Sequence, residues 1–337
     1  MSVAPPIVIC FGETLIRLSA PQHGRLEAAR HLDLVIGGAE ANVAVALSRL
    51  GSPAGVMTSL ADNPLGRAAL NALRAQGVDV ERIQLRPGRM GLYFVEEGAG
   101  LRATEVVYDR AGSAFALTPV EAWDWPRALS GARWLHLSGV TPALGEAPFE
   151  AALAGALAAA HAGLQVAFDG NFRASLWGAA TASPAERLMP LIAQASLAFV
   201  DHRDLALILG RDFDDPDPLT RRRRASEAAF AAFPRLQRIA STVRGEQDEL
   251  SAVMFARNGE HRAGPWPIGG AIGRIGAGDA FAAGVLHGLI TGMGDARALE
   301  FGLAAGALKH FLPGDFALIG AEAVERLLNG SNAEVRR

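Results

Sequence analysis

The chain has 337 residues, of which 50% are hydrophobic and 20% are charged, and its formal net charge at pH 7 is −3. This length is enough for one large α/β domain or two smaller ones, each with an ample core. The near-neutral charge gives no reason to expect nucleic acid or a membrane surface as a partner. Cys10 is the only cysteine, which excludes a disulfide framework or a cysteine-based zinc site within one chain.

Two common nucleotide-binding motifs are absent. Lys309 is the only lysine and does not follow a glycine, so the Gly-Lys-Ser/Thr of a P-loop cannot occur. The first apolar run leads into Gly12 without a Gly-x-Gly-x-x-Gly turn, which disfavours a Rossmann dehydrogenase. The N-terminus lacks the basic region of a signal peptide, and the most apolar helix candidate, residues 151–164, is too short to cross a membrane. We therefore expect a cytoplasmic protein.

The sequence before residue 80 predicts alternating strands and helices, a pattern typical of α/β domains. Its first apolar run is unbroken, as in a strand buried on both faces of a sheet. Gly37-Gly38 and Asn63-Pro64 each mark the start of a helix. The predicted strands are 7–11, 54–60 and, more weakly, 15–18 and 32–36, and the predicted helices are about 37–50 and 63–77.

Residues 90–96 and 104–110 predict the two strands of a hairpin around a turn at residues 97–100. The only two tyrosines, Tyr93 and Tyr108, face each other if the turn is centred near Gly100, and Arg110 shares the face of Tyr108. Tyrosine is a good strand former and often packs half-buried at a surface. Alternatively, two phenol hydroxyls and a guanidinium on one face form a polar wall for a hydroxylated, anionic ligand.

After residue 130 the alternation returns, and polar residues follow several strands. One such segment, 169–173, follows the strand 165–168, and another, 201–204, follows the strand 197–200. Ligands of α/β sheets bind beyond the carboxyl ends of parallel strands, so both segments are candidate site residues. The other predicted strands are 134–140, 239–243 and 250–256, and the predicted helices include 148–162, about 279–291 and 295–309.

The stretch Gly276-Ala277-Gly278-Asp279 predicts a tight turn that feeds a helix. The first N–H groups of a helix have no partner within it, and the helix dipole there favours an anion such as a phosphate. A carboxylate at such a site repels the ligand unless it has a chemical task, for example as the general base for an attacking hydroxyl. The simpler alternative is that Asp279 only caps the helix.

Two signatures of the chain resemble those of the ribokinase-like (PfkB) family of carbohydrate kinases. The first is Gly37-Gly38-Ala39-Glu40-Ala41-Asn42-Val43-Ala44 with Leu50-Gly51, and the second is Gly273-Arg274-Ile275-Gly276-Ala277-Gly278-Asp279-Ala280-Phe281. Their order and separation are those of the family. Further segments resemble the 2-keto-3-deoxygluconate kinases within it, namely 91–94, 108–114, 135–144, 169–173 with 176–177, 308–310 and 313–316.

The resemblance implies a ribokinase-like α/β fold, with a three-layer αβα core around a mostly parallel sheet and a small β-sheet lid that closes over the sugar. It implies one domain over residues 1–330, with the lid formed by about 14–36 and 89–111, followed by a polar tail at 331–337. Lid strands in this family often pair between subunits, so we expect a homo-oligomer, such as a dimer, formed through the lid.

The resemblance also implies ATP and Mg²⁺, and a role for each matching residue. Asp279 would take the proton of the sugar hydroxyl, while N–H groups around Gly276, Ala277 and Gly278 hold the transferring phosphoryl group. Two arginines suggest that the sugar carries a carboxylate, because the planar guanidinium binds one with two hydrogen bonds. The residues expected to contact the sugar are Gly37, Gly38, Asn42, Tyr93, Tyr108, Arg110, Val140 and Arg173.

The nucleotide side departs from the family pattern. Asp201 and Asp204 stand in place of Asn-x-x-Glu, and they either order Mg²⁺-bound waters, indirectly through Asp204, or cap a helix. Gly273 stands where the family usually has an acid, which leaves a monovalent-cation site in doubt. The remaining residues expected to contact the nucleotide are Thr242, Arg244, Gly245, Gly276, Gly278 and Lys309.

The leading hypothesis is a kinase that moves the γ-phosphoryl group of ATP to 2-keto-3-deoxygluconate and forms its 6-phosphate. A kinase for fructose, ribose or a related keto acid, such as one derived from galactonate, is an alternative within the family. A catalytically silent sugar-binding protein on the same fold is an alternative of another class. The presence of Asp279 and both glycines of its loop argues against the silent protein.

Overall fold

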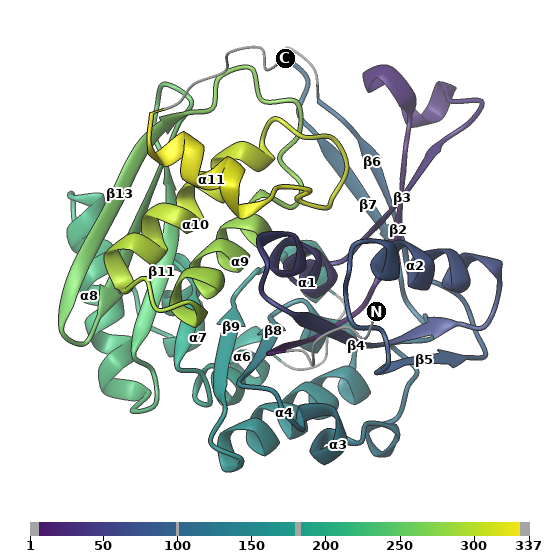
Figure 1. Cartoon of the computed structure of the whole chain (residues 1–337), viewed down its shortest axis with the longest axis horizontal. Helices are drawn as coiled ribbons and strands as arrows, with labels where there is room; N and C mark the ends of the chain where they lie inside the picture. Colours follow the sequence, from purple (N-terminus) through teal and green to yellow (C-terminus); the bar gives the residue numbers. More distant parts are fainter. Residues whose placement is uncertain (1–6, 99–100, 179–182, 331–337) are drawn as a thin grey trace.

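The structure is a computed structural model and describes residues 7–98, 101–178 and 183–330. Within these residues the central sheet has nine strands in the order β13-β12-β11-β10-β9-β8-β1-β4-β5 (Figure 1). The strands from β11 to β5 in this order are parallel, whereas β12 and β13 are antiparallel to their neighbours. The strands are β1 (Val8–Phe11), β4 (Ala54–Ala61), β5 (Ile83–Arg86), β8 (Trp134–Ser138), β9 (Gln165–Asp169), β10 (Leu197–Phe199), β11 (Arg238–Arg244), β12 (Glu249–Ala256) and β13 (Gly259–Pro267).

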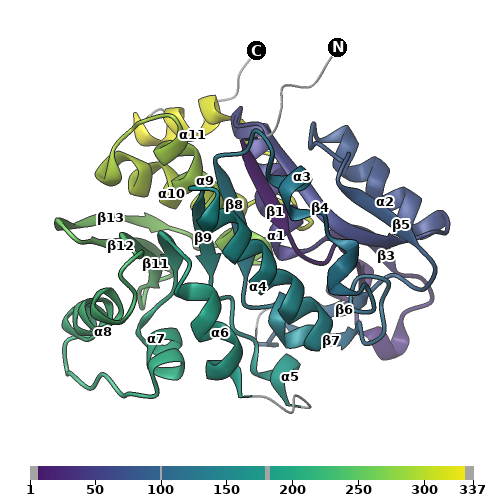
Figure 2. The ribbon, with the colours of Figure 1, turned by 90° about the horizontal axis from the view of Figure 1, so that it is seen from below.

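Helices cover both faces of this sheet and complete a three-layer core (Figure 2). One layer contains α1 (Ala39–Leu50), α2 (Pro64–Ala75), α9 (Ala277–Ile290), α10 (Asp295–Lys309) and α11 (Ala321–Leu328). The other contains α3 (Trp125–Leu129), α4 (Glu146–His161), α5 (Ala174–Trp177), α6 (Pro184–Ile192), α7 (His202–Leu209) and α8 (Pro218–Ala232). The predicted ribokinase-like α/β class is confirmed. No helix of the described residues is long and apolar enough to span a membrane.

Burial in the core explains why hydrophobic runs were the strongest indicators of strands and helices in the sequence. β1 lies between β4 and β8, and all four of its side chains are buried, as expected for a central strand of a parallel sheet. Small residues let α9 and α10 approach closely: a Cβ on Gly284 would lie 2.7 Å from the Cα of Gly302. The alanine-rich composition of these two helices therefore reflects their close packing beside the site.

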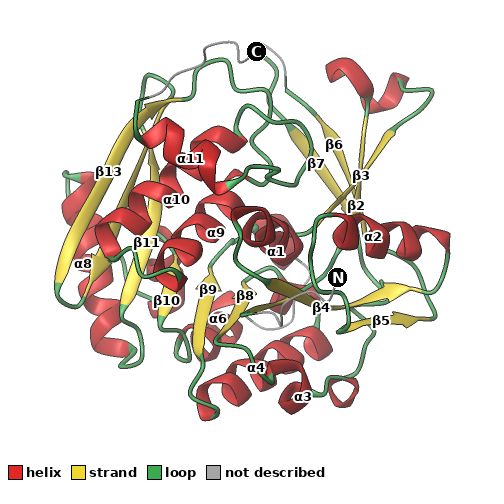
Figure 3. Cartoon of the chain, in the orientation of Figure 1, coloured by secondary structure: helices red, strands yellow, loops and turns green. Residues whose placement is uncertain are grey.

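A second sheet stands apart from the first (Figure 3) and has four strands within the described residues, in the order β3-β2-β6-β7. It is antiparallel except between β2 and β6. Tyr93 pairs directly with Tyr108 across β6 and β7, which confirms the predicted register. Ala99 and Gly100 of the predicted turn, and the tail 331–337, lie outside the described residues. The strands are β2 (Leu15–Ser19), β3 (Asp33–Gly37), β6 (Leu92–Glu96) and β7 (Glu105–Asp109).

Some elements differ from the sequence-based prediction. Helix α9 begins at Ala277, so Asp279 lies within its first turn and is not the first helical residue. Neither β5 nor β13 was predicted, because β5 has only four residues and β13 is largely polar and contains two prolines. Both are edge strands of the sheet, where such sequences are tolerated. The short 3₁₀ turns are Pro21–His23, Leu26–Ala28, Val120–Ala122 and Thr141–Leu144.

Candidate active site

A cavity of about 440 Å³ lies between the first turn of α9, the carboxyl edge of the large sheet and the second sheet. The predicted residues that line it are Gly38, Asn42, Tyr93, Tyr108, Arg110, Val140, Arg173, Gly276, Gly278 and Asp279. These come from the start of α1, the β6–β7 hairpin, the segments after β8 and β9, and the start of α9. The fold therefore brings together most of the residues that the sequence placed at the acceptor side of a site.

Asp279 is buried in the first turn of α9 and faces this cavity. Burial raises the pKa of its carboxyl to about 7, while the amide of Asn42 and the charge of Arg173 act in the opposite direction. The Asn42 side chain donates a hydrogen bond to Asp279 Oδ2 at 2.7 Å. A carboxyl that titrates near neutral pH and is held by one fixed donor is suited to accept a proton from a bound hydroxyl.

The loop before Asp279 has the geometry of an anion site. Gly276 precedes α9 with a φ of 81°, a left-handed conformation that favours glycine. A Cβ on Gly276 would also lie 2.1 Å from the backbone oxygen of Asp315, so no larger residue fits there. A Cβ on Gly278, in contrast, would meet no atom within 4 Å. The N–H of Ala277 donates to the backbone oxygen of Arg274 at 3.3 Å, so the first-turn N–H groups that can bind an anion in the cavity begin with that of Gly278.

The two tyrosines line the cavity on the side of the second sheet. Their ring centroids are 6.2 Å apart, and the Tyr93 hydroxyl donates a short hydrogen bond to Asp315 Oδ2. Asp315 is buried and lies 3.2 Å from the guanidinium of Arg17 on β2. Neither Asp315 nor Arg17 was assigned a site role from the sequence. The Pro-Gly-Asp-Phe turn was a signal for Asp315, but nothing in the sequence linked that turn to β2.

Arg110 and Arg173, the two arginines expected to bind a carboxylate, differ in burial and in ion pairing. Arg110 is ion-paired with Glu13 at 2.6 Å, and both side chains are at least nine-tenths buried. Its guanidinium also lies 5.8 Å from the centre of the Tyr108 ring, in agreement with the predicted shared face. Arg173 is exposed at the opposite side of the cavity, where its charge lowers the pKa of Asp169 and Asp279. Only Arg173 thus presents a charge that is not already offset by a carboxylate in direct contact.

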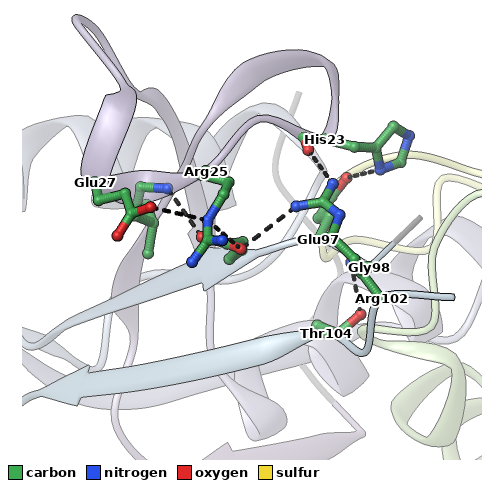
Figure 4. Close-up of polar contacts among 9 residues, drawn as sticks. His23, Arg25, Glu27, Glu97, Gly98, Arg102 and Thr104 are labelled. Carbon is green, nitrogen blue, oxygen red and sulfur yellow. Dashed lines mark hydrogen bonds and ion pairs between the residues drawn. The ribbon is translucent and has the colours of Figure 1, made fainter. Parts of the chain in front are cut away.

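Ion pairs connect the segment between β2 and β3 to the β6–β7 hairpin (Figure 4). Glu97 lies 3.5 Å from His23 and 3.5 Å from Arg17, so it joins this outer network to Asp315 in the cavity. Arg102 donates to the backbone oxygen of His23 and pairs with Glu96, which also accepts from the backbone of Leu26. The network fixes the hairpin that carries Tyr93 relative to the rest of the second sheet.

Three carboxylates, those of Asp169, Asp201 and Asp204, lie at or near the carboxyl ends of β9 and β10. Asp169 lines the cavity, and burial together with the charge of Asp279 raises its pKa to about 8. Asp201 and Asp204 form a capping box at the start of α7, which confirms the helix-cap alternative for this pair. Burial nevertheless raises the pKa of Asp204 to about 6. Its carboxyl carbon would lie 3.3 Å from a Cβ on Gly170, so the cap is close to the cavity.

Comparison with known proteins agrees with this geometry. The family model described as pfkB family carbohydrate kinase matches residues 7–315. The chain belongs to the pfkB family of carbohydrate kinases.

Named relatives of this kinase include enzymes for sugar acids. It is 37% identical over 333 residues to 2-dehydro-3-deoxygalactonokinase of Haloferax volcanii, and the match covers 98% of this chain and 99% of the relative. It is 28% identical over 314 residues to 2-dehydro-3-deoxygluconokinase of Bacillus subtilis, covering 91% and 90% of the two chains. The crystal structure of 2-dehydro-3-deoxygluconokinase of Thermotoga maritima superposes with a TM-score of 0.89 at 34% identity, covering 96% of this chain and 98% of that one.

Several residues predicted for this kinase lie outside the cavity lining. Thr242, Arg244 and Gly245 are at the carboxyl end of β11, where Arg244 lies 3.3 Å from the ring of His310. The space that a side chain on Gly37 would need is taken by the carboxylate of Asp315, at 2.1 Å. Lys309 is fully buried beneath the loop of Gly276. Asp169 and Asn171 also line the cavity and belong to the candidate segment 169–173, although neither was assigned a role of its own. The lining residues that were not selected from the sequence are Leu15, Ala39, Glu40, Val106, Arg274, Ile275 and Asp315.

Proposed function

We propose that this kinase phosphorylates a 2-keto-3-deoxy sugar acid, with 2-keto-3-deoxygluconate and its 6-phosphate as the first candidate pair. The observation that carries the proposal is the cavity itself, which is lined by two tyrosines, three arginines (Arg110, Arg173 and Arg274) and the buried Asp279. Phenol hydroxyls suit the hydroxyl groups of a sugar, and guanidinium groups suit its carboxylate. A neutral sugar would leave Arg173 without an anionic partner from the substrate.

The chemistry follows from the positions of Asp279 and the Gly276 loop. The sugar hydroxyl oxygen attacks the γ-phosphorus, its proton passes to the Asp279 carboxylate, and the bond from the γ-phosphorus to the bridging oxygen breaks as ADP leaves. The N–H groups at the start of α9 bind the charge on the transferring group. Phosphoryl transfer depends mainly on such positioning and charge stabilisation, since little covalent help is needed.

The residues near Asp169 fit a nucleotide bound with Mg²⁺. Asp169 and Asp204 are oxygen donors whose pKa values are raised by burial and by nearby carboxylates, so a cation would relieve their mutual repulsion. Mg²⁺, when bound with ATP, would offset the charge of the phosphates. Arg244 and Gly245 are exposed at the end of β11 and would contact the nucleotide beyond the phosphates.

The other sugar-acid epimer is the second candidate. The 37% identity to the Haloferax volcanii galactonokinase exceeds the identities to the two gluconokinases, so an acid derived from galactonate belongs in every assay. A dimer through the second sheet remains a prediction of the resemblance, and a cytoplasmic location remains a prediction from the sequence. Light scattering after size-exclusion chromatography tests the dimer.

The decisive experiment is an ADP-release assay with purified protein, ATP and Mg²⁺ against a panel of acceptors. The panel contains both 2-keto-3-deoxy acids, fructose, ribose and gluconate. We expect kcat/KM for one or both keto acids to exceed that for fructose and ribose by about 10²-fold or more, because a neutral sugar offers no carboxylate to the guanidinium donors that line the cavity. Faster turnover of a neutral sugar would contradict the acid assignment. Binding of a sugar without turnover by the wild type would favour the silent protein.

A further inference from the structure

The only lysine of the chain is buried in an unusual position. Lys309 is the last residue of α10, and its side chain has 0% exposure. Its ammonium group donates to the backbone oxygens of Leu312 at 3.1 Å and Gly314 at 2.9 Å. Lysine is almost never fully buried unless its charge has partners, and here those partners are carbonyl oxygens of one turn.

That turn carries two parts of the active site. Asp315 follows it directly, and the Asp315 carboxylate lines the cavity and accepts from Tyr93. The backbone oxygen of Asp315 lies against Gly276, where a Cβ would approach it to 2.1 Å. The Cε atom of Lys309 lies 3.3 Å from the same Cβ position. The ammonium group therefore fixes the turn, and the end of the same side chain packs beside the loop that begins α9.

A second set of contacts ties the end of α10 to the same loop. The backbone oxygen of His310, the residue after Lys309, accepts from the N–H groups of Ile272 at 2.9 Å and Gly273 at 3.1 Å. Gly273 is also the position where the resemblance leads one to expect an acid, which could hold an exchangeable cation. Gly273 supplies no carboxylate that could bind such a cation. The ammonium group of Lys309 is held in place by its own side chain, so it does not need a carboxylate at residue 273.

We propose that the Lys309 ammonium group is a tethered cation that positions the Gly276–Gly278 anion site and Asp315, and that it makes the rate of this kinase independent of an added monovalent cation. Burial lowers the pKa of this amine, while the nearby carboxylates Asp315 and Asp279 favour its charged form. Lys309 is thus a positioning residue with no predicted contact to the sugar. The inference rests on the proposed anion site but not on the identity of the sugar.

The first test uses the wild-type protein after exchange into buffers with sodium, potassium or tetramethylammonium as the only added monovalent cation. We expect kcat on whichever acceptor of the panel turns over fastest to agree within about twofold among the three. A rise in kcat of about tenfold or more with potassium would overturn the proposal, because an exchangeable ion, and not Lys309, would then position the anion site. This result needs no variant and decides the question even if the variants fail to fold.

The second test uses Lys309→Met, which keeps the length of the side chain without its charge, and Lys309→Ala, which leaves space for an ion. For Lys309→Met we expect kcat to fall at least about tenfold while the sugar KM changes less than about threefold. Ammonium or potassium should restore part of the rate of Lys309→Ala. An unchanged kcat in Lys309→Met, or a loss in Lys309→Ala that no cation reverses, would overturn the proposal.

Phe301→Leu, a fully buried position on the same helix, is the matched control for destabilisation. It should lower the thermal unfolding temperature without any response to ammonium. The two proposals fail separately: if the wild type turns over only neutral sugars, the sugar-acid function is wrong and Lys309 is tested on those sugars. If the wild type turns over sugar acids and Lys309→Met does so equally well, only the role of Lys309 is wrong.

Discussion

The proposed acceptor side and the proposed nucleotide side of the site are built differently. On the acceptor side, Asn42, Tyr93 and Asp279 are buried and hydrogen-bonded to neighbours within the protein. On the nucleotide side, Arg244 and Gly245 are exposed, and Asp201 is engaged in capping a helix. A buried polar group loses far more than an exposed one when a partner is removed. Changes on the acceptor side should therefore affect the chemistry, and changes on the nucleotide side should affect mainly binding.

The largest expected effect is that of Asp279→Asn. The amide cannot take the proton of the sugar hydroxyl, so we expect kcat to fall by about 10² or more, with sugar and ATP binding near normal. Calorimetric titration of the sugar and an ADP-release assay measure the two parts separately. Asp217→Asn, at the exposed cap of α8, is the control for loss of a carboxylate. A nearly intact rate in Asp279→Asn would remove the base assignment.

The acceptor side was also the more predictable one. Asp279, Gly276 and Gly278 follow one another in the chain, so a local pattern was enough to place them together. The facing of Tyr93 and Tyr108 followed from the twofold period of strands and the position of a turn. The central strands were predictable because they are buried on both faces, whereas the edge strands β5 and β13 carry no such signal.

Contacts between distant segments could not be predicted. Glu13 and Arg110 are 97 positions apart, and no charge pattern in the sequence indicated that they form a buried pair. The same holds for Tyr93 and Asp315, which are separated by 222 positions. For Lys309 the sequence suggested contact with the nucleotide, because nothing local showed that the carbonyl oxygens of the next turn would surround its amine. Such contacts depend on how the second sheet and the C-terminal turn pack together.

The dependence of the rate on pH tests the electrostatics of the acceptor side. The pKa of Asp279 is raised from 3.8 to about 7, and the base acts only as the carboxylate. We expect kcat to rise with pH, to level off above about 7, and to be about tenfold lower one unit below the pKa than at the plateau. A profile of kcat from pH 5 to pH 9 at saturating substrates measures this. A flat profile down to pH 5 would show that Asp279 titrates at its ordinary pKa.

The Glu13–Arg110 pair tests how the acceptor side recognises a carboxylate. Arg110→Ala alone would leave a buried, unpaired Glu13 and destabilise the fold by about 3–5 kcal/mol. A change in KM could then come from lost stability and not from lost recognition of the carboxylate. In the double variant Glu13→Gln/Arg110→Gln, a neutral pair replaces the charged one. We expect its KM for a keto acid to rise by about tenfold, with a much smaller change for a neutral sugar.

Glu13→Gln alone is the matched control, because it leaves the Arg110 charge without its partner next to the cavity. Since Arg110 is then a buried unpaired charge, KM is compared only at temperatures below the measured unfolding temperature of this variant. Its KM for a keto acid should fall or stay the same, opposite to the double variant. Equal losses on keto acids and neutral sugars in the double variant would return Arg110 to a purely structural role.

The smallest effect is expected at Asp204 on the nucleotide side. Asp204→Asn removes a charge but keeps an oxygen that can accept from the N–H of Asp201, so helix α7 should keep its cap. Because burial raises the pKa of Asp204 to about 6, the folded state disfavours its charged form, and the unfolding temperature of Asp204→Asn at pH 8 should not fall.

The Mg²⁺ requirement of the same variant tests the role of Asp204 at the site. If Asp204 orders waters on Mg²⁺, the Mg²⁺ concentration for half-maximal rate should rise about threefold in Asp204→Asn, with kcat unchanged at saturation. Asp201→Ala removes the cap and its own carboxylate and should cost about 1 kcal/mol of stability, whereas Asp201→Asn removes the charge but keeps an accepting oxygen. A shift in the Mg²⁺ titration of Asp201→Ala equal to that of Asp204→Asn, with none in Asp201→Asn, would mean that the shape of the loop, and not the charge of Asp204, sets the requirement.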